Sequence, residues 1–473
     1  MHYQNRLCFM GNQSKTAFFQ RIAGHLDRRR TRVSWIVVNA AQREVLRGEY
    51  DDADILYLPL STRSNSEPLP IKINDLVFSD RRLKFMPERG LDYMRAIQRP
   101  IIDFLDAGLP TLVVGELTYA YEVLTYRLVQ EYLPRVAWVS PFLTRVPAGR
   151  FAFFSDEAFS REVWPPPDGG LPLPDIAAAD EQIGYVEMNR KHIARQDSAA
   201  FLIGKLRRFM SLRDFDPEDP TWKSNSRREK LVKNMRWWVN RRSYARIRKV
   251  GLEAITACKG RSVIFPLHLQ PELNIDTCGR YWDNQAETIL KIWRQLGPDD
   301  ALFIKEHPVA IGNRGRAWFE RLLAFPNLYL LHHAVSVPEL LEAVDYVFTI
   351  SGTMGLEAAL GGGKVLCLAP TTYDRLENVV SPTIADFRGP GTIDDLYARL
   401  RAAKSDAWSL TDYLAHLERY AYHGDPEGDR IANPDSWRPR NLACIAAALE
   451  HVLSEIERAA DGGETDTSLV LQV

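Results

Sequence analysis

The sequence feature that most constrains the fold is a strand that runs through a turn of small residues into a helix. Residues 346–350 are apolar, which is typical of a buried strand. Residues 351–355 form the turn, and a helix that begins near Met354 carries Leu356 and Ala359 on its apolar face. Junctions of this kind are common in α/β proteins, where a helix follows the carboxyl end of a strand.

This turn has the properties of an anion site. The first N–H groups of a helix have no intrahelical acceptor, and the helix dipole favours negative charge at that end. Ser351 and Thr353 add hydroxyl donors, and Gly352 and Gly355 would let a phosphate approach the backbone closely. Glu357, one turn into the helix, could accept hydrogen bonds from a ribose. The turn therefore predicts a nucleotide-sugar phosphate site; the alternative is an ordinary strand–helix turn with a Ser or Thr cap.

Composition indicates a soluble globular protein with several domains. The chain has 473 residues, of which 45% are hydrophobic and 26% charged, and this length is enough for about two to four domains. The formal net charge of −1 gives no reason to expect nucleic acid as a partner. The five cysteines lack metal-ligand spacing, which indicates buried thiols in a reducing compartment. Without a signal-peptide core or a run of about 18 apolar residues, the expected location is the cytoplasm, either free or at the inner face of the cytoplasmic membrane.

The first part of the chain, residues 1–175, predicts a Rossmann-like domain. Short strands are expected at 6–11 and 33–38 with a helix between them, and this order indicates a parallel sheet with helices on its faces. A further strand at 111–115 delivers Glu116 to its carboxyl end, where open α/β sheets bind ligands. Glu116 is therefore a candidate general base. The alternative is a carboxylate that caps a helix or pairs with a cation.

A basic segment, residues 223–249, lies within a mostly helical and polar region, residues 176–257. It holds eleven Lys and Arg residues against one acid, Glu229. Interleaved tryptophans favour contact with anionic lipid or with a phosphorylated acceptor, and a solvated or intramolecular face is the alternative. Nucleic acid is not expected, because no recognition motif accompanies the patch. The candidate contact residues are Arg236, Trp237, Trp238, Arg241 and Arg242.

A second α/β domain, residues 258–400, places three polar motifs at the ends of successive strands. The motifs are Gln270-Pro271-Glu272, Lys305-Glu306-His307-Pro308 and Ser351-Gly352-Thr353. The carboxyl ends of parallel strands share one edge of a sheet, so these groups can converge. Lys305 and His307 are donors suited to a phosphate ester, and Pro308 fixes the turn that presents His307. Helices at 401–460 and a disordered tail at 461–473 are expected to follow.

Together the motifs resemble those of the capsule polysaccharide biosynthesis family of glycosyltransferases, which includes the bacterial β-Kdo transferases. The family's Gln-Pro-Glu, Lys-Glu-His-Pro and Ser/Thr-Gly-Thr-x-Gly-x-Glu-Ala patterns match residues 270–272, 305–308 and 351–358. The resemblance implies a GT-B-like fold, in which two Rossmann-like domains face a common cleft, here with a basic helical insert. It also implies a nucleotide-sugar donor, CMP-Kdo in some members, that the second domain binds without a metal or other cofactor.

Glycosyl transfer is the resulting hypothesis. The predicted donor-binding residues are Gln270, Lys305, His307, Ser351, Gly352, Thr353, Gly355 and Glu357, and the predicted catalytic residues are Glu116, Glu272, Asp276 and His307. The donor-binding groups would stabilise negative charge on the leaving nucleotide, and Glu116 would deprotonate or orient the acceptor hydroxyl. In a retaining reaction that passes through a covalent adduct, Glu272 or Asp276 could be the nucleophile.

The expected partners are a nucleotide-sugar donor, a glycan or glycolipid acceptor and an anionic membrane surface. Two other readings of the same motifs remain open. One is a different enzyme, a glycerophosphotransferase or a sugar-nucleotide epimerase, which would also hold a nucleotide phosphate with His and Ser/Thr side chains. The other is a non-catalytic GT-B-like scaffold that binds a glycan.

Overall fold

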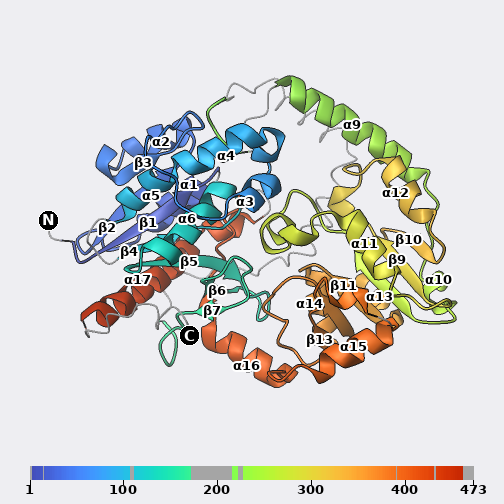
Figure 1. The fold of residues 1–473 in the computed structure, drawn as a ribbon. Helices are drawn as coiled ribbons and strands as arrows, with labels where there is room; N and C mark the ends of the chain where they lie inside the picture. Colours follow the sequence, from blue (N-terminus) through green and yellow to red (C-terminus); the bar gives the residue numbers. More distant parts are fainter. Residues whose placement is uncertain are drawn as a thin grey trace. The chain divides into compact units, whose positions relative to one another are not determined.

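A computed structural model describes residues 3–13, 15–106, 111–171, 216–221, 227–389, 391–430 and 433–461 (Figure 1). The chain forms two compact units. Unit 1 comprises Met1–Asn225 and Ala415–Val473, and unit 2 comprises Ser226–Leu414. Unit 2 is therefore inserted into unit 1 along the sequence.

The core of unit 1 is one sheet of eight strands. The strands are β1 (Asn5–Gly11), β2 (Thr31–Val37), β3 (Ile55–Tyr57), β4 (Thr111–Val114), β5 (Val136–Leu143), β6 (Arg150–Phe154), β7 (Glu162–Val163) and β14 (Tyr422–His423). Their order is β14-β6-β5-β4-β1-β2-β3, with β7 paired to β6. Strands β1 to β5 are parallel, and the pairs that involve β6 are antiparallel.

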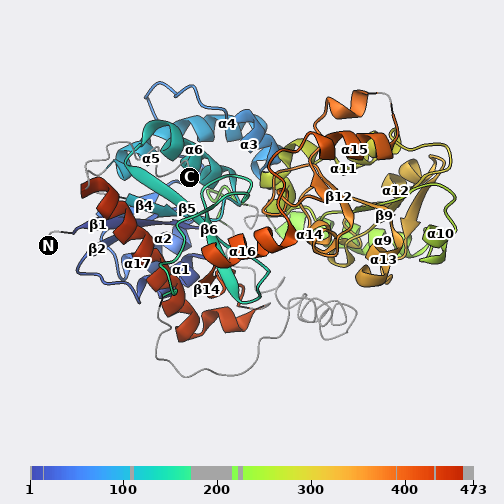
Figure 2. The same ribbon diagram turned by 90° about the horizontal axis from the view of Figure 1, so that it is seen from below.

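Helices cover this sheet, and the last helix of the chain is one of them. The helices are α1 (Lys15–Ala23), α2 (Ala40–Arg47), α3 (Asn74–Ser79), α4 (Pro87–Ala96), α5 (Gln98–Leu105), α6 (Ala120–Tyr132) and α17 (Pro439–Asp461), with short turns η1 (Asp52–Asp54), η2 (Leu83–Phe85) and η8 (Pro434–Trp437). Helix α16 (Leu410–Tyr420) begins in unit 2 and ends in unit 1. Ile445, Leu449 and Val452 recur at helical spacing on α17 and are buried in the same core as α1 (Figure 2). The C-terminal segment thus completes the N-terminal core.

Unit 2 is built around a parallel sheet of six strands. The strands are β8 (Ser262–Pro266), β9 (Ala301–Lys305), β10 (Leu328–Leu331), β11 (Tyr346–Thr349), β12 (Lys364–Cys367) and β13 (Val379–Val380), in the order β10-β9-β8-β11-β12-β13. The helices are α9 (Arg227–Ala245), α10 (Glu253–Thr256), α11 (Gln285–Trp293), α12 (Arg316–Leu323), α13 (Val337–Ala343), α14 (Thr353–Leu360) and α15 (Ile393–Ala402). Short turns are η4 (Asn274–Cys278), η5 (Arg280–Trp282), η6 (Pro308–Ala310) and η7 (Asp386–Arg388).

Both sheets have the strand order of a Rossmann fold. In unit 1 the parallel strands run β3-β2-β1-β4-β5, and in unit 2 the corresponding order is β10-β9-β8-β11-β12-β13. The order reverses between β1 and β4 in unit 1 and between β8 and β11 in unit 2, and ligands of open α/β sheets bind at the carboxyl ends of strands at such a switch point. The prediction of an α/β chain with two Rossmann-like domains is confirmed.

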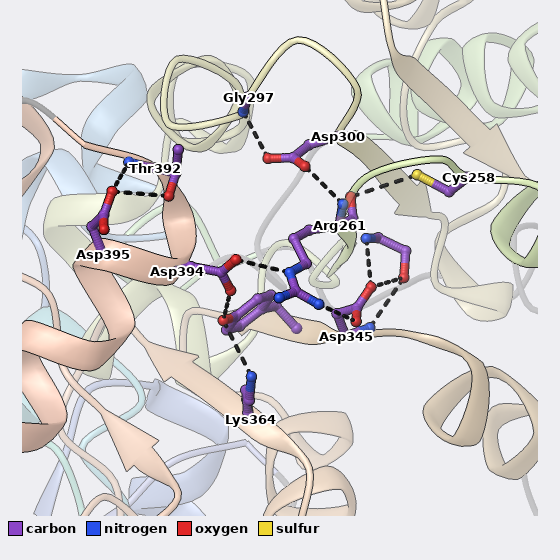
Figure 3. A network of polar contacts seen from close by, with 11 residues as sticks. Cys258, Arg261, Gly297, Asp300, Asp345, Lys364, Thr392, Asp394 and Asp395 are labelled. Atoms are coloured by element: carbon purple, nitrogen blue, oxygen red, sulfur yellow. Dashed lines mark hydrogen bonds and ion pairs between the residues drawn. The ribbon is translucent and has the colours of Figure 1, made fainter.

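The amino ends of the unit 2 strands carry a network of paired polar groups (Figure 3). The Arg261 guanidinium donates to Asp394 at 2.8 Å and lies 3.5 Å from Asp345, which also accepts from the backbone and hydroxyl of Ser262 at 2.8 and 2.9 Å. The Asp300 carboxylate accepts from the Arg261 N–H at 2.7 Å. The carboxylates and the guanidinium of this network have an opposite charge or a backbone donor beside them, and Lys364 lies 3.4 Å from the Tyr346 hydroxyl, so these groups are partnered within the protein.

The two units divide the chain differently from the expected segments. The basic helix α9 lies in unit 2 instead of a separate insert at 176–257, and α17 lies in unit 1 instead of a separate C-terminal segment at 401–460. About half of the expected insert, residues 176–215 and 222–226, and nearly all of the expected tail, residues 462–473, lie outside the described residues. No helix in the described part of the chain has the length and apolar character that a membrane crossing requires.

Candidate functional site

The turn after β11 lies at the switch point of unit 2. Gly352 is the N-cap of α14 and supplies no side-chain cap, so the first amides of this helix are not capped by their own N-cap residue. The Ser351 hydroxyl donates to the Asn274 carbonyl at 2.9 Å, and the Gly352 N–H donates to the Thr349 hydroxyl at 3.0 Å. Thr353 is exposed at the start of the helix. The predicted strand, turn and helix are all present.

Close packing requires both glycines of this turn. A Cβ on Gly352 would lie 2.9 Å from Cε1 of His268, and a Cβ on Gly355 would lie 2.5 Å from Cγ2 of Thr349 and 2.7 Å from the Tyr373 hydroxyl. Contacts within the protein therefore explain these glycines before any ligand is considered. Their predicted role in phosphate binding stays a prediction.

His268 is the central residue of this site that sequence reasoning did not select. It follows β8 and is buried, and its Nε2 accepts from the Ile350 N–H at 3.2 Å. The Thr349 hydroxyl lies 3.3 Å from the same nitrogen and already accepts from Gly352, so its own hydrogen is left for Nε2. The ring proton therefore lies on Nδ1. Burial, with the nearby charges of Arg314 and His307, lowers the pKa of His268 to about 3, so this imidazole is neutral.

His307 is also held in one neutral tautomer. The Val309 N–H donates to its Nδ1 at 3.3 Å, which leaves the proton on Nε2 as a donor. Burial and the charge of Lys305 lower the pKa of His307. Lys305 itself is buried and donates to the His333 carbonyl at 2.9 Å, and burial lowers its pKa. His307 can thus offer a neutral N–H, whereas one Lys305 donor is directed at the backbone.

A buried ion pair lies in the segment that follows β9, and its arginine also contacts the segment that follows β8. Arg314 donates to the Glu306 carboxylate at 2.6 Å and to the His268 carbonyl at 2.6 Å. The two charged side chains are 11% and 1% exposed. Glu306 also accepts the His307 N–H at 2.9 Å, so the pair fixes the backbone that presents His307. No local sequence pattern selects Arg314, because it lies seven residues after His307 in a loop.

The remaining predicted donor-side residues lie on the loop after β8. The Gln270 amide donates to the Asp283 carbonyl at 3.1 Å and accepts from Gln285 at 2.9 Å. Glu272 is half-buried just before η4, and Asp276 is buried within it. The bond from Ser351 to the Asn274 carbonyl attaches η4 to the turn. Hydrogen bonds therefore link the segments after β8, β9 and β11. Glu357 is exposed on α14, shortly after the turn in sequence.

In unit 1, Glu116 follows β4 next to the carboxyl end of β1. Lys15, the first residue of α1, lies 2.6 Å from the Glu116 carboxylate and also donates to the Pro426 carbonyl. The Asn12 side chain lies 3.4 Å from Glu116 and 2.8 Å from Glu122. The ion-paired alternative for Glu116 is thus present, and the pair lies at the switch point, where a ligand would bind.

Two further carboxylates beside Glu116 were missed. Glu122 is fully buried, and burial together with the Glu116 charge raises its pKa to about 7. Glu427 is half-buried, and burial followed by the charge of Asp425 raises its pKa, with Lys15 acting in the opposite direction. Among the described residues, no hydrogen bond or ion pair reaches the Glu427 carboxylate. Its position more than three hundred residues after Glu116 left no sequence signal.

The five predicted contact residues of the basic segment fall on two faces of α9. Trp237 and Arg241 are half-buried, with the Arg241 guanidinium 5.3 Å from the Trp237 ring. Arg236, Trp238 and Arg242 are exposed. The predicted contact role of these five residues stays a prediction. Within the described residues, no group of three or more His, Cys, Asp and Glu side chains is placed to hold a metal ion.

Comparison with known proteins agrees with the motifs of unit 2. Residues 220–376 match the sequence profile of a family described as capsule polysaccharide biosynthesis protein, which confirms the predicted resemblance over that part of the chain. No characterised protein matches the sequence significantly.

Solved structures with a similar chain path include two transferases from Thermosulfurimonas dismutans. The KpsC β-Kdo 2,7 transferase has 11% identity and a TM-score of 0.37, with coverage of 92% of this chain and 97% of that chain. The KpsC β-Kdo 2,4 transferase has 14% identity and a TM-score of 0.31, with coverage of 74% and 88%. The Arabidopsis thaliana protein UGT89C1, complexed with UDP, has 14% identity and a TM-score of 0.26, with coverage of 96% and 99%.

Proposed function

We propose that this protein is a glycosyltransferase of surface-polysaccharide synthesis that transfers a sugar, Kdo or a related ulosonic acid, from a CMP-activated donor to a glycan or glycolipid acceptor. The observation that carries the proposal is the set of hydrogen-bond donors at the switch point of unit 2, where His307, His268 and the start of α14 come together. The profile match over residues 220–376 supports the same reaction class.

On the donor side, unit 2 would bind the phosphate of the nucleotide. The neutral Nε2–H of His307, the uncapped amides of α14 and the Thr353 hydroxyl are donors for its oxygens. Lys305 and Arg314 add positive charge that is shielded from water, where charge acts more strongly than at an exposed surface. These groups would stabilise the negative charge that develops on the departing nucleotide.

On the acceptor side, unit 1 would supply the base. Glu116, which lies 2.6 Å from the Lys15 ammonium group, could accept the proton of the acceptor hydroxyl. Glu427 is the second candidate, because burial raises its pKa and so makes it a stronger base than an ordinary carboxylate. Glu272 and Asp276, on the loop after β8, are the candidate nucleophiles of a retaining reaction.

The test compares His307→Ala with the native protein, using His25→Ala, an exposed histidine of unit 1, as the matched control. We expect His307→Ala to stay folded and to lose about a hundredfold in turnover, the size of effect seen when one stabilising donor is removed. Thermal unfolding with CMP, UDP, CDP or GDP present measures binding independently, since a ligand of the native state raises the melting temperature. We expect CMP alone among these nucleotides to raise the melting temperature of the native protein, and we expect His307→Ala to abolish this rise.

Full activity of His307→Ala with purified donor would contradict the assignment. Product analysis then separates the other readings: an epimerase converts the nucleotide sugar with no acceptor present, and a scaffold leaves it unchanged.

A further inference from the structure

Helix α9 presents an exposed apolar stripe to solvent. Leu231, Val232, Met235, Trp238 and Val239 have exposed fractions of 48%, 42%, 61%, 48% and 57%. They recur at intervals of three and four residues, so they share one side of the helix. Single exposed apolar residues are ordinary on a protein surface, but a run along two turns of one helix marks an interaction surface. We call these five residues the outer stripe.

The opposite side of α9 attaches the helix to unit 2. Trp237 packs against Gly312, where a Cβ would lie 2.9 Å from the indole ring and where φ is +102°. Tyr244 is 3% exposed, and its ring lies 5.4 Å from that of Phe319 on α12. Figure 1 shows α9 alongside α12. Because these anchors hold the inner side, the outer stripe stays turned toward solvent.

Positive charge surrounds the outer stripe. The basic residues of α9 are Arg227, Arg228, Lys230, Lys233, Arg236, Arg241 and Arg242, and Glu229 is the acid of this helix. The Arg242 guanidinium lies 3.6 Å from the centre of the Trp238 ring, so a cation lies on the apolar stripe itself. An apolar face with Trp, bordered by Lys and Arg, is the pattern of a helix that lies in the interface of an anionic bilayer.

We infer that the outer stripe of α9 lies in the surface of a membrane that contains acidic phospholipids, with the helix parallel to the bilayer plane. A second copy of the chain fits less well, because two-fold pairing of this side would bring the same arginines together with Glu229 as the one acid of each helix to compensate. Nucleic acid would use the charge but gain nothing from Leu231, Val232 and Met235. The inference rests on the proposed function in one respect: a membrane-bound enzyme would meet a lipid-linked acceptor.

The test is flotation of the full chain with phosphatidylcholine vesicles that contain about one third phosphatidylglycerol, against vesicles of phosphatidylcholine alone. The apolar variant is Met235→Ser with Val239→Ser, and the charge variant is Arg236→Gln with Arg242→Gln. Phe85→Ser is the matched control, because Phe85 is the most exposed large apolar residue in the described part of unit 1, at 78%. Circular dichroism checks that each variant keeps its helix content.

We expect the native chain and Phe85→Ser to float with the anionic vesicles. We expect each α9 variant to bind these vesicles at least about tenfold more weakly than the native chain. Equal binding of all chains, absence of binding by the native chain, or binding that ignores lipid charge would overturn the inference. The inference would also be overturned if the native chain associated with itself in the absence of vesicles and the apolar variant abolished that association. An assay of sugar transfer to a water-soluble acceptor separates the two proposals. Vesicle binding without any sugar transfer contradicts the proposed function alone. Sugar transfer without vesicle binding contradicts only this inference.

Discussion

The two units use the same strand order but place different kinds of side chain at their switch points. In unit 1 the loops after β1 and β4 gather carboxylates, Glu116 and Glu122, with Glu427 contributed by the C-terminal segment. In unit 2 the loops after β8 and β9 gather histidines and cations, among them His268. The strand order determines which loops meet, and the residues on those loops determine what chemistry can occur there.

Burial has opposite consequences at the two sites. Carboxylates that crowd together in a dry environment resist ionisation, so the pKa of Glu122 rises to about 7. Histidines that are buried beside cations resist protonation, so the pKa of His268 falls to about 3. Both shifts favour neutral forms near pH 7. The raised pKa lets Glu122 hold a proton near pH 7, and the lowered pKa keeps His268 from taking up a second proton.

The largest effect is expected from the carboxylates of unit 1. Under the proposed function, Glu116→Gln should lower kcat by about 10²–10⁴-fold without unfolding the protein, because a general base contributes that much. Glu427→Gln is the matched variant in the same cluster. Steady-state kinetics with a soluble acceptor measures both. A large loss only in Glu427→Gln would transfer the base role to Glu427, and full activity of both variants would contradict the assignment of this cluster to acceptor activation.

The next effect concerns the buried ion pair of unit 2. Arg314→Met should lower the free energy of unfolding by about 3–5 kcal/mol, because it leaves the Glu306 carboxylate buried without its partner. Adding Glu306→Gln should recover part of that loss. Lys15→Met in unit 1 should cost less, since Glu116 is 26% exposed and water can solvate it. Urea denaturation gives all three values, and a loss near zero for Arg314→Met would show that the pair does not hold this loop.

A smaller effect is expected from pH on His268. The unfolded chain takes up a proton at this residue near pH 6.5, whereas the native chain does so only near pH 3. Stability is therefore lost as pH falls below 6.5, by about 2 kcal/mol between pH 6.5 and pH 5. His268→Gln should show a shallower decline over this range, and exposed His25→Gln should follow the native curve. Parallel curves for the native chain and His268→Gln would contradict the neutral, buried imidazole.

The smallest effect separates structure from ligand binding in the turn after β11. Ser351→Ala removes the bond to the Asn274 carbonyl and should lower the free energy of unfolding by about 1 kcal/mol. Thr353→Ala changes an exposed side chain and should alter stability by less than about 0.5 kcal/mol. Under the proposed function it should nevertheless weaken donor binding, measured as a higher KM. An unchanged KM would remove Thr353 from the donor site.

Local patterns predicted the elements of the fold well, because each strand and helix is encoded by neighbouring residues. The junction at 346–360 is an example, since its apolar residues and its glycines are contiguous. Local patterns did not select His268, because its contact with Ile350 depends on the pairing of β8 with β11. Glu427 had no signal at all, since its neighbours in space come from the other end of the chain.

The basic segment shows a different limit. Its composition indicated an interaction surface, but composition has no direction. Trp237 and Trp238 are adjacent in sequence, yet helical geometry turns the first toward Gly312 and the second toward solvent. Reading the helix by its phase, from Leu231 to Val239, would have separated the two sides in advance.

The insertion of unit 2 into unit 1 has a consequence for how the protein is made. Residues 226–414 leave the ribosome as an uninterrupted stretch, so unit 2 can complete its core during synthesis. Unit 1 cannot, because α17, which buries Ile445 and Leu449 in the same core as α1, is translated only after the whole of unit 2. A nascent chain stalled before residue 439 therefore carries a finished unit 2 beside an open sheet whose apolar surface awaits its final helix. For this protein, closure of the first domain therefore waits until unit 2 has been synthesised.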